Sequence, residues 1–124
     1  MSSRPSEDDL IAHYFAPLAA PAGLGLRDDA ALLSPPPGRE IVLTTDALVA
    51  GVHFFADDPP DAIARKALRV NLSDLAAKGA QPVGFLLNLA LPRDWSAPWL
   101  AAFAAGLGDD AARFACPLLG GDTV

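Results

Sequence analysis

The chain has 124 residues, which is enough for one domain with a buried core. Hydrophobic residues make up 52% of it and the mean hydropathy is +0.28, so the composition excludes a disordered chain. The net charge is −6, and lysine and arginine form no basic stripe interleaved with aromatic residues. This distribution argues against a nucleic acid as partner.

Cysteine usage and the N-terminus indicate the compartment. Cys116 is the single cysteine and lies in an apolar run, so we expect a buried structural thiol in a reducing environment. The first residues contain no apolar signal region, and no apolar stretch is long enough to span a bilayer. We therefore expect a cytoplasmic protein without a membrane partner.

The first predicted elements are a short helix and a strand. The helix begins at Ser6 and ends at Pro17. After a glycine-rich turn, Asp28 and Asp29 open a predicted strand over residues 30–33. Side chains alternate along a strand, so at most one of these carboxylates can point into a given site. Taken alone, the pattern favours turn chemistry over metal ligation.

The stretch after the proline-rich connector places polar groups at the end of a strand. Residues 41–45 are rich in β-branched side chains and predict the strand, and Asp46 follows at its end. His53 lies in the short loop beyond Gly51. Strands fix position and loops bring side chains to a ligand. We interpret Asp46 as a magnesium ligand and His53 as a contact to a phosphorylated substrate.

A helix is predicted over residues 61–78, and its faces differ in character. At about 100° per residue, Arg65 and Arg69 fall on a solvated face. Asp74 falls on the opposite side, between two apolar flanks. A carboxylate among apolar neighbours must be paired or bound to a metal. Metal ligation and an ion pair with Lys78 are equally open.

The next strand and helix are predicted to form the core. Residues 83–91 are almost continuously apolar, as in a strand covered on both faces. Ser96 caps a long helix that runs to about Phe114 and carries an aromatic stripe. Asp109 and Asp110 follow two glycines inside this helix. The helical periodicity continues through them, so we expect both carboxylates to be solvated.

The sequence ends in a glycine turn that carries an acid. Gly120 and Gly121 would allow a ligand to approach the backbone, and Asp122 follows at once. Because the sequence stops at Val124, inside a predicted strand, we expect it to be part of a longer protein.

The acidic residues share one context and predict a magnesium site. No Cys/His cluster supports zinc, whereas carboxylate and hydroxyl oxygens suit Mg²⁺, which usually also holds phosphates. No Walker loop, kinase glycine loop or nucleophile elbow occurs. The pattern favours metal-assisted phosphoryl transfer. The candidate ligands are three acids at strand ends or turns, one acid on a helix and nearby hydroxyls: Asp29, Asp46, Asp122, Asp74, Thr44, Thr45 and Thr123.

Four runs together resemble the N-terminal part of thiamine-monophosphate kinases, in the wider aminoimidazole-ribotide-synthetase-like superfamily. They stand in the family's order and spacing: Asp28-Asp29-Ala30-Ala31-Leu32, residues 43–54, residues 66–80 and Leu119-Gly120-Gly121-Asp122-Thr123. We therefore expect an α+β fold with a mixed or antiparallel sheet and helices packed on one face. The resemblance implies that residues 1–124 are an N-terminal domain whose sheet contributes to a homodimer, and that a C-terminal domain is missing.

The resemblance also implies an activity and roles for individual residues. It implies ATP- and Mg²⁺-dependent phosphorylation of thiamine monophosphate to thiamine diphosphate by direct transfer, without a catalytic nucleophile. It implies substrate contact by His53 and nucleotide contact at Gly121 and Asp122. The family completes the phosphate site with its C-terminal domain, so we expect the isolated chain to be inactive. The metal ligands implied are Asp29, Thr44, Thr45, Asp46, Asp74 and Asp122.

Two positions depart from the family pattern, and two functions other than the kinase stay open. Arg27 stands where many members have glycine, and Ala104 and Ala105 stand where an aromatic often lies near the nucleotide. One alternative is a non-catalytic module that binds Mg-nucleotide and dimerises. The other is a sister ATP-using enzyme of the superfamily, such as the purine-pathway synthetase. Measuring turnover of thiamine monophosphate and of aminoimidazole precursors distinguishes the kinase from such a sister enzyme.

Overall fold

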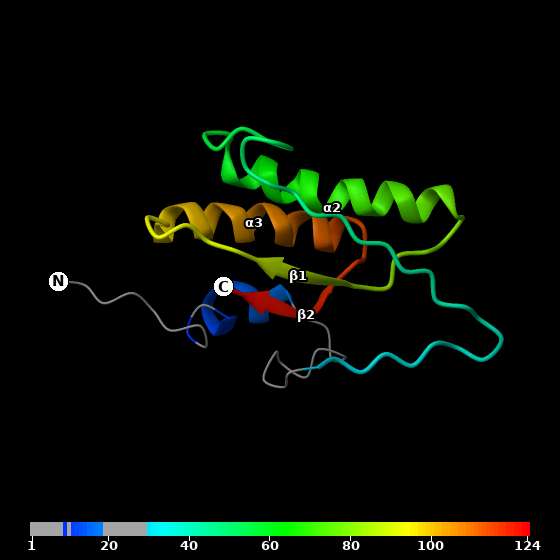
Figure 1. Ribbon diagram of the computed structural model, residues 1–124. Coiled ribbons are helices and arrows are strands. Elements are labelled where there is room, and N and C mark those ends of the chain that lie inside the picture. Colours follow the sequence, from blue (N-terminus) through cyan, green and yellow to red (C-terminus); the bar gives the residue numbers. More distant parts are fainter. Residues whose placement is uncertain (1–8, 10, 19–29) are drawn as a thin grey trace.

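The computed structural model describes residue 9, residues 11–18 and residues 30–124 (Figure 1). The start of the predicted N-terminal helix at Ser6 lies outside the described residues. In chain order the elements are the π-helical turn η1 (Ile11–Phe15), the 3₁₀ turn η2 (Ala16–Leu18), helix α2 (Pro60–Ala77), strand β1 (Phe85–Leu89), helix α3 (Ala97–Arg113) and strand β2 (Leu118–Thr123).

The strands form a parallel pair connected through α3. Phe85 of β1 lies opposite Leu118 of β2, and Leu89 lies opposite Thr123. Parallel strands need a crossover between them, and α3 supplies it. Both long helices lie on the same side of the pair (Figure 1). The predicted α+β fold is confirmed, and the parallel pair excludes an entirely antiparallel sheet.

The predicted strands over residues 30–33 and 41–45 are absent. Both segments belong to an extended arm, residues 30–58, that runs outside the packed elements and crosses α2 (Figure 1). Local β propensity is not sufficient for a strand, which also needs a neighbouring backbone for its hydrogen bonds. No described segment pairs with either stretch, and Leu43 is 87% exposed.

The core lies where α2, α3 and the strand pair meet. Its central side chains come from both helices and β2, and Cys116 is buried among them as predicted. Burial raises the pKa of the Cys116 thiol, which keeps it protonated. The helices approach closely at Gly106, where a Cβ would lie 2.7 Å from the Cα of Asp61. The buried cluster comprises Phe15, Ile63, Ala64, Leu68, Leu100, Phe103, Ala104, Leu107, Cys116 and Leu118.

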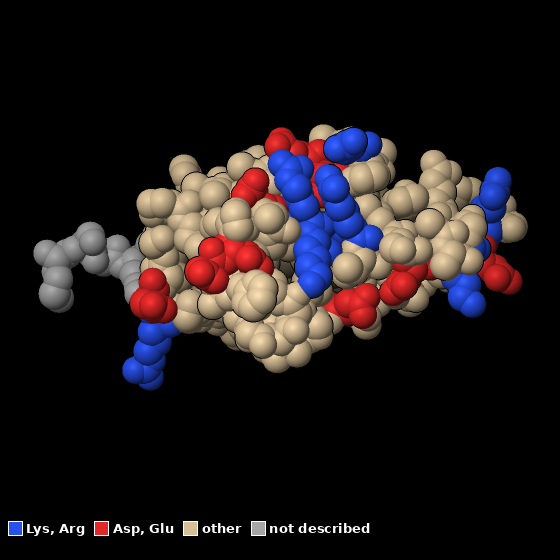
Figure 2. All heavy atoms as spheres, turned by 90° about the horizontal axis from the view of Figure 1, so that it is seen from above, with Lys and Arg blue, Asp and Glu red and all other residues tan. Residues whose placement is uncertain are grey.

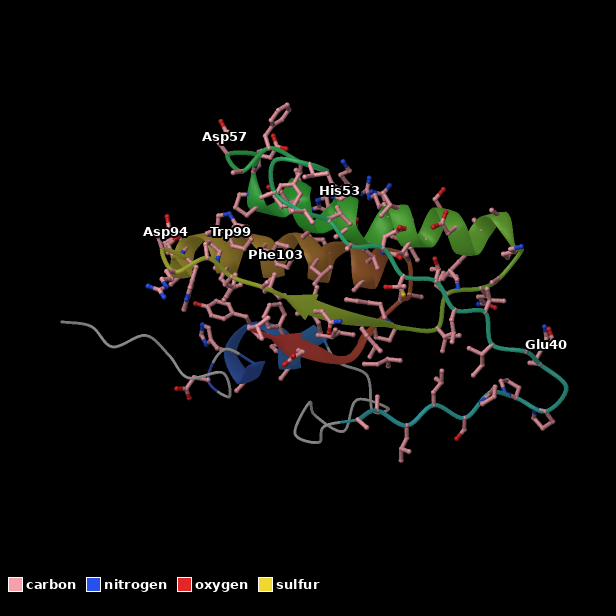
Figure 3. The ribbon with its side chains drawn as sticks, viewed as in Figure 1. Glu40, His53, Asp57, Asp94, Trp99 and Phe103 are labelled. Atoms are coloured by element: carbon pink, nitrogen blue, oxygen red, sulfur yellow. The ribbon has the colours of Figure 1, made fainter. Side chains whose placement is uncertain are left out.

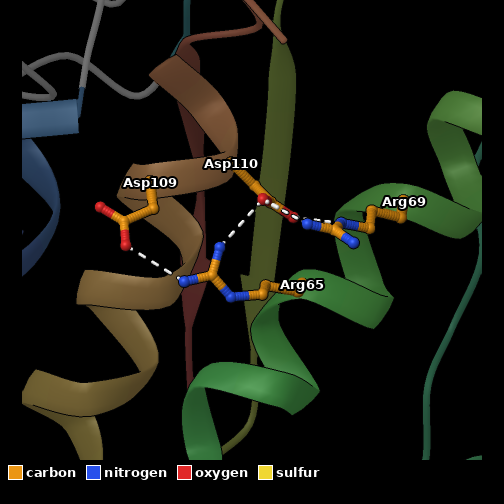
Figure 4. Close-up of polar contacts among 4 residues, drawn as sticks. All are labelled: Arg65, Arg69, Asp109 and Asp110. Carbon is orange, nitrogen blue, oxygen red and sulfur yellow. Dashed lines mark hydrogen bonds and ion pairs between the residues drawn. The ribbon is translucent and has the colours of Figure 1, made fainter. Parts of the chain in front are cut away.

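An ionic cluster joins α2 to α3 (Figure 4). The carboxylate of Asp110 is 0% exposed and accepts hydrogen bonds from Nε of Arg69 at 2.7 Å, Nη2 of Arg69 at 3.0 Å and Nη1 of Arg65 at 3.0 Å. Asp109, whose side chain is 73% exposed, accepts one from Nη2 of Arg65 at 3.1 Å. Hydrogen bonds from Arg69 lower the pKa of Asp110, and the one from Arg65 adds to the effect against the opposing influence of burial.

The ionic cluster corrects two predictions. Asp110 is buried and not solvated, and Arg65 and Arg69 contact α3 and do not form a purely solvated face. Helical periodicity showed that Arg65 and Arg69 share a face of α2. It could not show that α3 packs close enough to that face for Asp110 to bind both. The prediction for Asp109 as a solvated carboxylate is correct.

The turn from α3 into β2 holds a strained alanine. Ala115 has φ +50°, and it is the one non-glycine residue with positive φ in the part of the chain that the structure describes. The turn closes with a 2.9 Å hydrogen bond from the Cys116 amide to the Ala111 carbonyl. Glycine adopts this conformation without the steric cost of a Cβ.

We expect Ala115→Gly to raise the free energy of unfolding by about 1 kcal/mol. The melting temperature, followed by circular dichroism, should then rise by about 4 °C. Ala101→Gly, on the exposed side of α3, is the matched control and should lower stability by about 1 kcal/mol. Equal destabilisation by both substitutions would contradict the assignment of strain to Ala115.

Candidate functional site

Two predicted metal ligands from distant segments meet on the surface of α2. Oγ1 of Thr44, on the arm, donates a hydrogen bond of 3.5 Å to Oδ2 of Asp74, although 30 positions separate the two residues. Both side chains are exposed, and in the described residues no ion pair links Asp74 to Lys78. Among the described residues, the Asp74 carboxylate therefore has a hydroxyl and no basic side chain as its polar partner.

The predicted inward position of Asp74 is wrong. The buried positions of α2 are Ile63, Ala64 and Leu68, all in its N-terminal half. Figure 1 shows the C-terminal half of α2 projecting past the end of α3, and Asp74, which belongs to that half, is exposed. An open position removes the desolvation cost that a buried carboxylate would carry, and it leaves the oxygens accessible to a cation.

Asn71 adds an acceptor that was not among the predicted site residues. Its Nδ2 donates to the Ala67 carbonyl at 2.9 Å, and its Oδ1 is buried without a hydrogen-bond partner among the described atoms. Residues three apart on a helix share a side, so Asn71 lies one turn before Asp74 on the same side. The three-residue spacing of Asn71 and Asp74 is the feature of the sequence that could have identified Asn71 as a candidate site residue.

The loop that carries His53 (labelled in Figure 3), residues 49–58, is closed by hydrogen bonds of its backbone. The Val49 carbonyl accepts hydrogen bonds from the amides of Val52 at 3.0 Å and His53 at 2.9 Å. The Gly51 amide donates to the Phe54 carbonyl at 2.8 Å, and Gly51 has φ +80°, a conformation that favours glycine. The loop that carries the predicted substrate contact therefore forms a turn closed by hydrogen bonds.

The imidazole of His53 presents one nitrogen outward. Its Nδ1 accepts a 2.9 Å hydrogen bond from the Val49 amide, so in the neutral ring the proton resides on Nε2. The side chain is exposed, and Nε2–H is available as a donor. The backbone carbonyl of the same residue accepts a hydrogen bond from Nζ of Lys66 on α2.

Gly121 and Asp122 lie within β2. Gly121 has φ +148°, and a Cβ there would lie 1.7 Å from the carbonyl oxygen of Leu87 on β1. The close pairing of β1 and β2 thus requires glycine at this position. The sequence alone suggested ligand approach as the reason for Gly121 and did not show this packing requirement. Asp122 follows with an exposed side chain, opposite Asn88 in the strand register. The nucleotide contact assigned to both residues stays a prediction.

The predicted ligand set is only partly assembled. Thr45 and Asp46 continue the exposed arm beyond Thr44, whereas Asp29 lies outside the described residues. Within residues 30–124 and the described N-terminal turn, no three Asp, Glu, His or Cys side chains converge into a metal-binding group. The oxygen donors at Thr44 and Asp74 fit a hard cation such as Mg²⁺. The six-residue ligand set stays a prediction.

Side chains of both charges share one face of the molecule. On the face shown in Figure 2, lysine and arginine side chains gather near the centre, with aspartate and glutamate side chains on either side of them. In the described part of the chain, no helix has the length and apolar character needed to cross a bilayer.

Comparison with known proteins identifies the class to which this fold belongs. The family described as AIR synthase related protein, N-terminal domain, matches residues 27–124, and the chain belongs to this family. Its relatives include the thiamine-monophosphate kinase of Caulobacter vibrioides, 50% identical over 122 residues that cover 97% of this chain and 35% of the relative. The thiamine-monophosphate kinase of Escherichia coli K12 is 45% identical over 120 residues, covering 94% of this chain and 37% of the relative.

A solved structure agrees with these relatives. The crystal structure of thiamine monophosphate kinase from Aquifex aeolicus matches with a TM-score of 0.62 and 36% identity, covering 64% of this chain and 27% of that chain. The resemblance to thiamine-monophosphate kinases is confirmed. The chain spans about a third of the length of the curated relatives it matches.

Proposed function

We propose that the chain is the metal- and nucleotide-binding part of a thiamine-monophosphate kinase. The proposed reaction transfers the γ-phosphoryl group of ATP directly to the phosphate of thiamine monophosphate. The observation that carries the proposal is the contact of Thr44 with Asp74, because it joins two of the four family-like runs at one place on the surface. The names of the relatives supply the substrate class.

The proposed roles follow from the chemistry of each side chain. Asp74, Thr44, Thr45 and Asp46 would hold Mg²⁺ together with Asp29 and Asp122. Mg²⁺, when bound, neutralises the charge of the transferred phosphoryl group. His53 donates from Nε2–H to a phosphate oxygen of the substrate, since its Nδ1 is already an acceptor for the Val49 amide. Positioning and charge compensation suffice for this reaction class, so no residue acts as a nucleophile.

We further propose that residues 1–124 form an N-terminal domain of a cytoplasmic homodimer, completed by a C-terminal domain. Exposed apolar side chains gathered along the arm support an interface, because exposed apolar patches larger than those of a typical monomer mark protein–protein contacts. The C-terminal domain would complete the phosphate site, and the isolated chain is therefore proposed to be inactive. These apolar residues are Leu32, Leu33, Ile41, Val42, Leu43, Val49, Val52 and Phe55.

The test is a product assay on a chain extended to the length of its relatives. We expect thiamine diphosphate to form from ATP and thiamine monophosphate, and formation to stop when Mg²⁺ is removed with a chelator. Turnover with aminoimidazole precursors in place of thiamine monophosphate would instead identify a sister enzyme of the superfamily. Binding of Mg-ATP without any product would identify a binding and dimerisation module.

A further inference from the structure

The loop that presents His53 is joined to α2 by one side-chain hydrogen bond. Its other polar contacts are internal: the Val49 amide binds the His53 ring, and the Phe55 amide binds Oδ2 of Asp58 at 2.9 Å. In the described residues, the hydrogen bond from Nζ of Lys66 to the His53 carbonyl is the one polar side-chain link from this loop to the helix. Internal hydrogen bonds give the loop its shape, and Lys66 adds the polar side-chain link to α2 beside the packing of Phe54 against the core.

Two atoms of His53 are held from different sides. Nδ1 is fixed by the Val49 amide within the loop, and the carbonyl oxygen is fixed by the ammonium group of Lys66 from the first half of α2. Fixing both ends of one residue leaves Nε2 as its single outward polar atom. The half-buried Phe54 packs against the core beside it, but an apolar contact does not set the direction of the ring.

Lys66 is well placed for a role outside the core. It is exposed, and among the described residues it takes part in no ion pair, so its ammonium group is not required by the ionic cluster of Arg65, Arg69, Asp109 and Asp110. Hydrogen bonds from a charged donor are about twice as strong as neutral ones. One such bond can hold a short loop that is already closed by its internal contacts.

We propose that Lys66 is a positioning residue that holds the His53 loop on α2 and thereby sets the affinity for the phosphorylated substrate. The proposal rests on the proposed function, in which His53 donates to a substrate phosphate. Lys66 acts through His53 and does not itself contact the reacting atoms. Its removal should therefore weaken substrate binding without altering the transfer step or the nucleotide site.

The test compares Lys66→Met with Lys66→Arg and with Lys78→Met. Lys78 lies at the end of the same helix, is exposed, and makes no side-chain hydrogen bond or ion pair among the described residues, which makes it a matched control. In the extended chain, Lys66→Met should raise the KM for thiamine monophosphate about 10-fold, as expected for one lost charge-assisted hydrogen bond. The KM for ATP and kcat should stay within about twofold. Lys66→Arg should restore the KM, and Lys78→Met should not change it.

A second readout does not depend on activity. Hydrogen exchange of the Val49 amide, measured by NMR on the 124-residue chain, should accelerate about 10-fold in Lys66→Met and not in Lys78→Met, because a loosened loop opens more often. Unchanged exchange would overturn the positioning role, and faster exchange with an unchanged KM for thiamine monophosphate would overturn its link to the substrate. Failure of the proposed function is seen separately, as absence of thiamine diphosphate from the unsubstituted extended chain.

Discussion

Asp74→Asn is expected to lower kcat for thiamine diphosphate formation by about 100-fold or more, the range seen when one charged stabilising group is removed from a phosphoryl-transfer or oxyanion site. Asparagine has nearly the same size but lacks the charge that holds a divalent cation. The carboxylate is exposed and unpaired within the described residues, so the change should alter the unfolding free energy by no more than about 0.5 kcal/mol. Steady-state assays over a range of Mg²⁺ concentration measure the effect.

The control for this prediction is another exposed carboxylate. Asp94 lies before α3, at the opposite end of the helix layer from the C-terminal half of α2 (Figure 3). Asp94→Asn removes the same charge from the chain without touching the arm, and we expect kcat to be unchanged. If Asp74→Asn retained the kcat of the Asp94→Asn variant, Asp74 would not be a metal ligand. Asp46→Asn should behave like Asp74→Asn.

Asp110→Ala is expected to lower the free energy of unfolding by about 3 kcal/mol, as is typical when one partner of a buried ionic cluster is removed. The side chain is fully buried and accepts three hydrogen bonds from Arg65 and Arg69, so alanine leaves both guanidinium groups without their shared acceptor. Urea titration measures the loss. Asp109→Ala should cost less than about 1 kcal/mol, because Asp109 makes an exposed ion pair with Arg65. Equal costs for the two substitutions would contradict the account of the cluster.

The stabilisation by Asp110 should depend on pH in the acid range. The two hydrogen bonds from Arg69, followed by the one from Arg65, lower the pKa of Asp110 in the folded chain. A carboxyl group with a lowered pKa contributes fully above its unfolded pKa of about 3.9 and loses this contribution as the pH falls through the folded pKa. The difference in unfolding free energy between the unsubstituted chain and Asp110→Asn should therefore shrink below about pH 4. A constant difference down to about pH 2 would argue against an ionised Asp110.

The long helices were predictable because their signals are local. The helix predicted over residues 61–78 is observed at Pro60–Ala77, and the helix from Ser96 is observed at Ala97–Arg113. Ser96 caps the latter by accepting a 3.2 Å hydrogen bond from the Trp99 amide. The predicted strand over residues 83–91 is shorter, at Phe85–Leu89, because its length is set by pairing with β2.

The rest could not be predicted, because it depends on what packs against each element. The stretch 41–45 has β-branched residues but no described neighbour to pair with, so it remains part of the arm. Asp74 has the spacing of an inward residue, yet α2 projects past α3 and the position is open. The contact of Thr44 with Asp74 joins residues whose proximity in space no local pattern contains. The family resemblance named both residues, and the fold brings this pair together.

The central claim is that Thr44 and Asp74 belong to one Mg-nucleotide site. It is tested most directly by calorimetry of Mg-ATP binding to the extended chain, with and without thiamine monophosphate, for the unsubstituted protein, Asp74→Asn and Asp94→Asn. We predict that Asp74→Asn weakens Mg-ATP binding by about 10-fold or more, equivalent to about 1.4 kcal/mol, whereas Asp94→Asn binds like the unsubstituted protein. Equal affinity for Mg-ATP in all three proteins would contradict the claim.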